Sequence, residues 1–361
     1  MSKALRILHL APRLSERGGA DQHLLAQLEA LADRDEQALC VERIDPDIRP
    51  PCRLWSCAGL GASGLRPAAW DRARLEALVA EWRPAVIHLH NVVAPEVLEW
   101  AADRPAVLTV QDHRIFCPGR GKWTAAGAVC DQPLDEARCA GCFTDPDYFA
   151  AVWRLTRRRL RAAARLRLCV LSDYMRRELE AAGLARQRPA VIPPLLRPWP
   201  AAAAPQAECV LFAGRLVAAK GVGDAVAAWR SSGVDLPLVL AGTGSLRAEL
   251  EAAGLDVRGW LDRPRLAALL RAARVVVMAP RWQEPFGIAG LEALAAARPV
   301  AAWRSGGIAE WHPGPGLVDW GDVAGLGRAI AALVAGERPA PREPERAGLI
   351  ARQRALFAAL C

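Results

Sequence analysis

The sequence predicts an α/β protein made of two doubly wound, Rossmann-like domains that face each other across a cleft. Short apolar segments alternate with helical segments along both halves of the chain. Residues 5–10, LRILHL, are followed by a glycine-bearing loop and then by a helix, which is how a doubly wound domain begins. Residues 193–207 are rich in proline and alanine, and the same alternation restarts after them.

Length and composition fit this organisation. The chain has 361 residues, 52% of them apolar and 24% charged, so two sizeable cores can form and global disorder is excluded. No apolar run reaches the ~18 residues of a membrane span, and no secretory signal is recognisable, so we expect a soluble, cytoplasmic protein. The net charge of +8 suits an anionic ligand, and no nucleic-acid-binding module is evident.

The N-terminal domain is expected to span residues 1–195. Its first helix begins at Asp21, and the leucines that follow recur at helical spacing. Strands are expected at residues 5–10, 85–90, 106–110 and 168–171. Further helices are expected at residues 71–82, 93–102, 147–165 and 173–182. Strands joined by helices form a parallel sheet, and ligands bind at the carboxyl ends of its strands.

The linker is expected at residues 196–207, and the C-terminal domain at residues 208–340. Strands are expected there at residues 208–212, 238–241, 275–278 and 299–302. Helices are expected at residues 223–232, 245–253, 264–272, 287–297 and 322–335. The remaining segment, 341–361, is expected to form a helix that packs back on the N-terminal domain.

The strongest functional pattern is the segment 281–294, RWQEPFGIAGLEAL. Pro285 and Gly287 predict a turn into a helix whose first backbone N–H groups can bind an anion. Glu284 precedes this helix, so it is suited to accept hydrogen bonds from sugar hydroxyls. Glu292 lies about two turns into the helix, where a buried carboxylate can bind a ribose diol. Two solvated glutamates are the alternative, which leaves the turn unexplained.

A second pattern places two cations after the first strand of the C-terminal domain. The strand ends in Gly214 and Arg215, and Lys220 follows shortly before the next helix. Arg215 can clamp a diphosphate with its planar fork, and Lys220 can act as a point charge. Solvated loop cations are the alternative. Lysine is scarce in this chain, which favours a function for Lys220.

Together these segments resemble the retaining glycosyltransferases of the GT-B fold, specifically glycosyltransferase family four. The resemblance rests on FAGRLVAAKGV, LVLAGTGSL and PRWQEPFGIAGLEALAAARPVAAWRSGGIAEW, and on ILHLAP and GGADQHLLAQLEAL near the N-terminus. It implies that Glu284, Arg215 and Lys220 are catalytic. It also implies a set of residues that bind the donor: Gly18, Gly19, Gln111, Gly214, Arg258, Trp260, Phe286, Gly287, Ile288 and Glu292.

The resemblance also implies the reaction. A sugar would pass from a nucleotide-diphosphate sugar, with UDP as the expected nucleotide, to an unidentified hydroxyl or other nucleophilic acceptor, which could be a small molecule, a glycan or a lipid-linked sugar. Arg215, Lys220 and the helix start near Ile288 would stabilise the leaving diphosphate, so no metal cofactor is required for catalysis. A non-catalytic nucleotide-sugar binder and a nucleotide-sugar epimerase are the alternatives.

One departure from the family pattern follows the strand at 106–110. The family commonly has a His-Asp pair there, whereas this chain has Gln111, Asp112 and His113. Gln111 can hydrogen-bond a sugar hydroxyl but cannot carry a proton, so the identity of the sugar is left open. We favour donor binding by Gln111 over a structural role. His113 and Arg114 are placed on the acceptor side, with a satisfied loop histidine as the alternative for His113.

The remaining histidines of the N-terminal domain are assigned to structure. His88 and His90 alternate along one strand and therefore face the same side. Such a pair suggests metal, but no third ligand is evident nearby in the sequence, so packing or a hydrogen bond is favoured. His23 lies on the first helix behind the glycine loop and is also expected to be structural.

Four cysteines gather in an insertion at residues 114–146 that is expected on the acceptor side. In a reducing compartment, Cys117, Cys130, Cys139 and Cys142 could bind one structural zinc that orders this glycine-rich segment. The Cys-x-x-Cys pair supports zinc, but the wider spacings match no standard module. Reduced thiols or a disulfide pair remain the alternative.

Arginines recur at helical spacing on one face of the segment 148–172, which contains no acidic residue. The members of this stripe are Arg154, Arg157, Arg158, Arg161 and Arg165. A solvated helix face is favoured for the stripe, and contact with an anionic membrane surface is the alternative.

Overall fold

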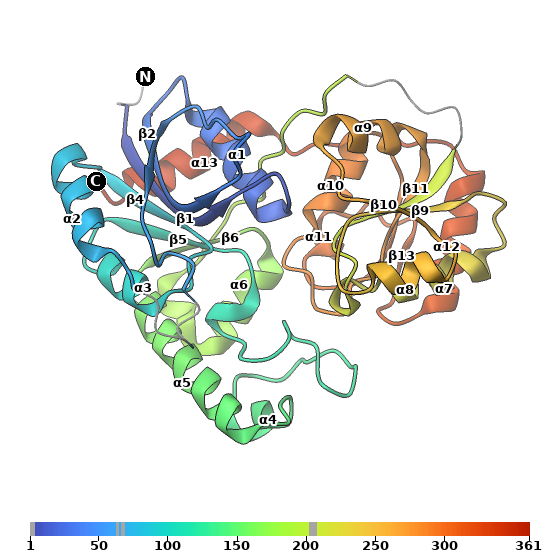
Figure 1. The fold of residues 1–361 in the computed structure, drawn as a ribbon, viewed down its shortest axis with the longest axis horizontal. Helices are drawn as coiled ribbons and strands as arrows, with labels where there is room; N and C mark the ends of the chain where they lie inside the picture. Colours follow the sequence, from blue (N-terminus) through green and yellow to red (C-terminus); the bar gives the residue numbers. More distant parts are fainter. Residues whose placement is uncertain (1–3, 63–64, 66–68, 202–207) are drawn as a thin grey trace. The chain divides into compact units, whose positions relative to one another are not determined.

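The computed structural model describes residues 4–62, 65, 69–201 and 208–361. The chain divides into two compact units (Figure 1). Unit 1 is Met1–Arg197 with Pro344–Cys361, and unit 2 is Pro198–Glu343. Each unit has a parallel sheet with helices on its faces, which confirms the predicted α/β class. Part of the predicted linker, residues 202–207, lies outside the described residues.

The sheet of unit 1 has the strand order β3-β2-β1-β4-β5-β6-β7, and all its pairings are parallel. Its strands are β1 (Arg6–Leu14), β2 (Glu36–Ile44), β3 (Arg53–Ser56), β4 (Val86–His90), β5 (Ala106–Val110), β6 (Arg167–Val170) and β7 (Ala190–Val191). The three central strands β1, β4 and β5 are almost fully buried because helices cover both faces.

Helices of unit 1 form two layers on this sheet. One layer contains α2 (Arg72–Trp82), α3 (Pro95–Ala101), α5 (Pro146–Ala163) and α6 (Asp173–Leu179). The other contains α1 (Gly19–Leu31) and the C-terminal helix α13 (Arg346–Ala358), whose Phe357 is buried against Ile7 and Val86 of the sheet. Between β5 and α5 lie the short helices η1 (His113–Ile115) and α4 (Glu136–Ala140). After α6, the chain continues as η2 (Glu180–Leu184) and η3 (Ala185–Gln187).

The sheet of unit 2 has the order β10-β9-β8-β11-β12-β13 and is also parallel. Its strands are β8 (Cys209–Ala213), β9 (Leu238–Ala241), β10 (Asp256–Gly259), β11 (Ala273–Met278), β12 (Val300–Trp303) and β13 (Leu317–Val318). Its helices are η4 (Ala218–Lys220), α7 (Val222–Ser232), α8 (Arg247–Ala252), α9 (Arg263–Ala272), α10 (Ile288–Ala295), α11 (Ile308–Trp311) and α12 (Val323–Ala335). Helices α7 and α12 pack on one face, and α9 and α10 lie on the other (Figure 1).

The structure corrects several expected elements. Strand β1 extends to Leu14, beyond the predicted end at residue 10. The helix predicted to residue 182 continues after Leu179 as the π-helical segment η2. Strands β2 and β3 were not predicted, because the apolar run of β2 is short and flanked by charged residues and β3 is largely exposed. No helix among the described residues has the length and apolar character that crossing a membrane requires.

Candidate active site

Two loops meet at the carboxyl ends of β8 and β11 in unit 2. Backbone N–H groups of Arg281 and Trp282 donate to the carbonyl of Ala219 at 3.0 and 3.3 Å, which joins the segment after β11 to η4. The close approach requires Gly221, which has φ 65° and whose added Cβ would lie 1.6 Å from the carbonyl oxygen of Ala279. The fold therefore fixes Lys220 beside the loop that carries Glu284.

The side chains of these loops form an ion pair. Lys220 Nζ lies 2.8 Å from Oε2 of Glu284, and the indole N–H of Trp282 donates to the same oxygen at 2.6 Å. The Lys220 ammonium also lies 4.4 Å from the centre of the Trp282 ring, and the Arg215 guanidinium lies 5.9 Å from it. The Glu284 side chain is only 10% exposed. We call Arg215, Lys220, Trp282 and Glu284 the charged cluster.

The loop after β12 holds Glu284 from the other side. The backbone N–H of Glu284 donates to Ser305 Oγ at 3.1 Å, and Ser305 Oγ donates to the carbonyl of Trp282 at 2.9 Å. The N–H of Gly307 donates to the carbonyl of Glu284 at 2.8 Å. Two neighbouring loops therefore hold Glu284 in place. The sequence around Glu284 predicts only a turn and does not show these contacts.

Helix α10 begins where the turn predicts it. Its N-cap Gly287 has φ 87°, a left-handed conformation that suits glycine, and the carbonyl of Phe286 accepts a hydrogen bond from the Trp311 indole. No side chain caps this helix start, so its first backbone N–H groups can interact with an anion. The side chains of Phe286 and Ile288 are buried. These two predicted donor-binding residues can therefore contact a donor only through their backbone.

Glu292 lies on α10 beside a second arginine. Arg263 Nη1 lies 3.4 Å from Oε1 of Glu292, and the Arg263 guanidinium lies 4.4 Å from the centre of the Trp199 ring. Trp199 in turn donates its indole N–H to the carbonyl of Glu292 at 3.0 Å, and Arg263 donates to the carbonyl of Pro198 at 3.2 Å. Neither Arg263 nor Trp199 was predicted as a site residue. No local pattern marks them, because their contacts join distant segments.

The other donor residues predicted in unit 2 lie nearer the surface. Gly214 directly follows β8, and its backbone N–H donates to the carbonyl of Ala241. Arg258 is ion-paired with Asp256 on the edge strand β10, and Trp260 directly follows that strand with 39% of its surface exposed. The side chains of Arg258 and Trp260 take no part in the contacts given above for the charged cluster.

In unit 1 the predicted residues lie at two strand ends. Gly18 is the N-cap of α1, and next to it Asp21 accepts hydrogen bonds from Ser15 and Arg13. Burial raises the pKa of Asp21, and the bonds from Ser15 and Arg13 offset part of that rise. Gly19 is the first residue of α1.

Gln111 follows β5 and is 8% exposed. Its side-chain Nε2 is buried and has no hydrogen-bond partner among the described residues, which fits an amide that awaits a ligand oxygen. Its backbone N–H donates to the side chain of Asn91 at 3.4 Å.

The residues after Gln111 are engaged within unit 1. Burial alone would raise the pKa of Asp112, but Arg114, 2.6 Å away, holds that pKa below its usual value. His113 is buried at 3% exposure, and its Nε2 lies 3.0 Å from the hydroxyl of Tyr174. The Nε2 contact holds His113 within unit 1, whereas Arg114 is half exposed and can reach a ligand.

The cysteine insertion is only partly gathered. A Cβ added at Gly119 would lie 3.9 Å from the sulfur atoms of both Cys117 and Cys142. Cys139 is near enough to the other three thiols for them to raise its pKa, although burial is the larger cause. Across the described residues, no three of these sulfur atoms come within 4.8 Å of one another, and none forms a disulfide. The zinc site stays a prediction.

The predicted arginine stripe is partly neutralised. Arg158 pairs with Glu96 and Glu99, and Arg165 pairs with Asp103. Part of this face of α5 therefore packs on acidic residues in and after α3.

Two doubly wound units in tandem, with a carboxylate, a lysine and an uncapped helix start at the strand ends of the second, have the architecture of the GT-B class. Family models agree: "Glycosyltransferase Family 4" matches residues 17–196, and "Glycosyl transferases group 1" matches residues 207–336. The chain belongs to the GT4-type glycosyltransferases.

Curated relatives match over shorter stretches. A GDP-mannose-dependent alpha-(1-6)-phosphatidylinositol dimannoside mannosyltransferase of Mycobacterium tuberculosis is 46% identical over 92 residues, which is 24% of this chain and 24% of that protein. A D-inositol 3-phosphate glycosyltransferase of Pseudarthrobacter chlorophenolicus is 36% identical over 138 residues, covering 32% of this chain and 33% of that protein. The chain thus matches about a quarter to a third of the length of these relatives.

Solved structures match over nearly the whole chain and show the fold. Anabaena HepE in complex with UDP and glucose has a TM-score of 0.65 at 17% identity, covering 98% of this chain and 95% of that chain. Sucrose-phosphate synthase from Thermosynechococcus elongatus has a TM-score of 0.63 at 19% identity, covering 99% and 94%. These matches confirm the predicted GT-B fold.

Proposed function

We propose that the protein is a retaining glycosyltransferase that moves a sugar from a nucleotide-diphosphate sugar to a hydroxyl acceptor. The observation that carries this proposal is the charged cluster, in which Lys220, Arg215 and Glu284 gather at the carboxyl ends of β8 and β11. Ligands bind at this edge of doubly wound sheets, so the cluster lies where a donor is expected.

The chemistry assigned to the cluster is charge stabilisation. As the bond between the anomeric carbon and the diphosphate oxygen breaks, negative charge grows on the diphosphate. In this proposal Lys220, Arg215 and the first N–H groups of α10 stabilise this charge, which the ion pair of Lys220 and the uncapped helix start support. The acceptor oxygen bonds to the anomeric carbon on the same face, and its proton passes to the departing diphosphate. These cations make a divalent metal on the diphosphate unnecessary, so activity should not depend on added Mg²⁺ or Mn²⁺.

The two carboxylates have separate parts in this proposal. Glu284 accepts hydrogen bonds from the donor sugar and also orients Lys220, to which it is paired. Glu292 accepts hydrogen bonds from the ribose hydroxyls, and Arg263 and Trp199 hold it in place. Gln111, with its unpartnered buried amide, is assigned to the donor sugar.

UDP is the proposed donor nucleotide. HepE was solved with UDP and glucose, whereas one curated relative is described as GDP-mannose-dependent, so the base has to be tested. A thermal-shift screen of UDP-, GDP-, ADP- and dTDP-sugars identifies the donor, because a ligand that binds only the folded state raises its stability by RT ln(1 + [L]/Kd).

The stereochemistry and the alternatives are tested together by following the best donor with proton NMR in the presence of candidate acceptors. We expect a product with the anomeric configuration of the donor and release of the nucleoside diphosphate. Binding without any turnover would support a non-catalytic binder. A free epimerised sugar nucleotide formed without acceptor would support an epimerase.

A further inference from the structure

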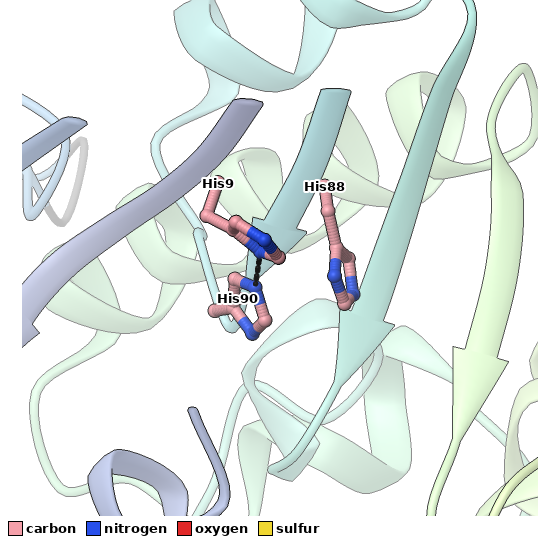
Figure 2. A group of neighbouring side chains, drawn as sticks. All are labelled: His9, His88 and His90. Carbon is pink, nitrogen blue, oxygen red and sulfur yellow. Dashed lines mark hydrogen bonds between the residues drawn. The ribbon is translucent and has the colours of Figure 1, made fainter. Parts of the chain in front are cut away.

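Three histidines converge inside unit 1, on the sheet face covered by α1 and α13. His9 lies on β1, His88 and His90 lie on β4, and His9 is directly opposite His88 in the parallel register. All three are almost completely buried, with exposures of 0, 0 and 3%. Figure 2 shows the rings of His9 and His90 joined by a hydrogen bond, with the His88 ring beside them. The sequence showed only the pair on β4; the third ring comes from the adjacent strand.

The rings are close enough to share one ion. One ring nitrogen from each histidine lies within 4.8 Å of the other two. The ring centres of His88 and His90 are 3.9 Å apart, and His9 Nδ1 lies 2.9 Å from His90 Nε2. Two nitrogens bound to one tetrahedral ion at about 2.0–2.1 Å lie about 3.3 Å apart. Small adjustments of the side-chain angles would fit all three nitrogens to such an ion.

Outer hydrogen bonds hold two of the rings. Gln37 Nε2 donates to the carbonyl of Leu28 at 2.9 Å, so Oε1 of the same amide faces His9 Nε2, 3.1 Å away. His9 Nε2 must then carry the proton, which leaves a lone pair on Nδ1. His88 Nε2 similarly lies 2.7 Å from Thr109 Oγ1. Metal-binding histidines characteristically have their second nitrogen held in this way.

The remaining nitrogens are left unsatisfied. Nδ1 of His88 and Nδ1 of His90 are buried and have no hydrogen-bond partner among the described residues. Burial lowers the pKa of His9 to about 4 and lowers those of His88 and His90 well below the ordinary value, which favours neutral rings. Neutral imidazole is the form that binds metals. A chain of hydrogen bonds from Gln37 through His9 to His90 satisfies both nitrogens of His9 and Nε2 of His90. It leaves Nδ1 of His88 and Nδ1 of His90 without a partner among the described residues.

Histidine is also concentrated here. The chain has six histidines, and His23 of α1 lies near enough to affect the pKa of both His88 and His90. His23 is itself buried, and its Nδ1 has no partner among the described residues. Three of the six histidines thus lie on one face of the sheet, and a fourth lies on the helix that covers it.

We propose that His9, His88 and His90 bind one divalent transition-metal ion of the kind that prefers imidazole, with zinc as the physiological candidate. The ion would link β1 to β4 and stabilise unit 1. Three neutral ligands leave a fourth position for water, hydroxide or His23. None of the three histidines is among the residues assigned to the donor.

The test uses the full-length protein stripped with a chelator and titrated with Co²⁺ or Zn²⁺ alone. We expect about one equivalent of Co²⁺ to give visible d–d absorption without the near-ultraviolet band of thiolate ligands, and Zn²⁺ to raise the melting temperature. The titrations are made in protein that carries Cys139→Ser, because this change removes one predicted zinc ligand of the cysteine insertion. His312→Gln is the matched control, since His312 is buried in unit 2 and bonded to a backbone carbonyl. It should bind metal normally, whereas His88→Gln should not.

Two further measurements keep the test decisive if a histidine variant fails to fold. Gln37→Leu leaves all three ligands in place but should weaken metal binding about 10–100-fold through the lost outer hydrogen bond. X-ray absorption of the zinc-loaded wild-type protein should show nitrogen neighbours at about 2.0–2.1 Å. A stripped protein that takes up no metal, or a spectrum with sulfur ligands only at about 2.3 Å, would overturn the proposal.

Discussion

Lys220 and Glu284 form an ion pair, with Lys220 Nζ 2.8 Å from Glu284 Oε2. The two residues were predicted separately, the lysine for the diphosphate and the glutamate for the sugar. Their pairing means that a donor phosphate bound by Lys220 would share the lysine with Glu284 or displace Glu284 from it. The same contact keeps the lysine oriented, because Trp282 binds the same carboxylate oxygen and packs against the ammonium.

The first prediction concerns this ion pair. Lys220→Ala should lower kcat strongly, since removing a group that stabilises transition-state charge costs on the order of 2–4 kcal/mol. Steady-state kinetics with the donor found by the screen measures the loss. A double-mutant cycle with Glu284→Gln should show coupling between the two residues, because each single change leaves the other charge unpaired. Additive effects would mean that the pair does not act as a unit.

The second prediction concerns Arg215, which lies beside Trp282 in the charged cluster. Arg215→Ala should reduce turnover and leave the melting temperature nearly unchanged, because the residue is exposed. Arg247→Ala is the control: this arginine is also exposed in unit 2 and pairs with Glu251 outside the cluster. Normal kinetics for Arg215→Ala would remove the residue from the site.

The third prediction separates the two glutamates. Glu284→Ala should chiefly lower kcat, whereas Glu292→Ala should weaken binding of the free nucleoside diphosphate by about 1.5–3 kcal/mol, the usual value for hydrogen bonds to a charged group. Calorimetry with the diphosphate alone measures the second effect. A Glu292→Ala protein that binds the diphosphate as well as wild type would refute the ribose contact.

The fourth prediction makes Arg263 a positioning residue for Glu292. Arg263→Ala should weaken binding of the nucleoside diphosphate, because it removes the guanidinium held between Glu292 and Trp199. The weakening should disappear with a 2′,3′-dideoxy nucleotide, which lacks the hydroxyls that Glu292 contacts. Arg265→Ala, on the same helix with a side chain 75% exposed, should change neither affinity. Equal weakening for both nucleotides would indicate a general structural defect.

The fifth prediction is the structural zinc of Cys117, Cys130, Cys139 and Cys142. Elemental analysis of protein prepared without added metal should find zinc that is partly lost in the Cys139→Ser variant, and that variant should be impaired in acceptor use more than in donor binding. X-ray absorption distinguishes these sulfur ligands from the histidine site. An unchanged zinc content in Cys139→Ser would leave the cysteines as reduced thiols.

Sequence patterns predicted the local features well. The strand at 208–212, the turn at Pro285 and the helix after Gly287 occur as β8 and α10 within a few residues. Periodicity and turn chemistry are local, so they can be recognised without the fold. Edge strand β3 has no such pattern, since most of its residues are exposed.

The contacts that define the site could not be predicted in this way. Arg263 reaches Glu292 across 29 positions, and Lys220 reaches Glu284 across 64. His9 joins His90 across 81 positions through strand pairing. Such pairs depend on which strands become neighbours, which only the folded sheet determines.

The most direct test of the glycosyltransferase assignment is release of nucleoside diphosphate from the best-bound donor, measured for wild type and Lys220→Ala with and without acceptor. We predict release by wild type that depends on acceptor, and release by Lys220→Ala that is about 30- to 1,000-fold slower, which corresponds to the loss of one charge-stabilising group. Wild-type protein that binds the donor but never releases the diphosphate, or equal release by both proteins, would contradict the account.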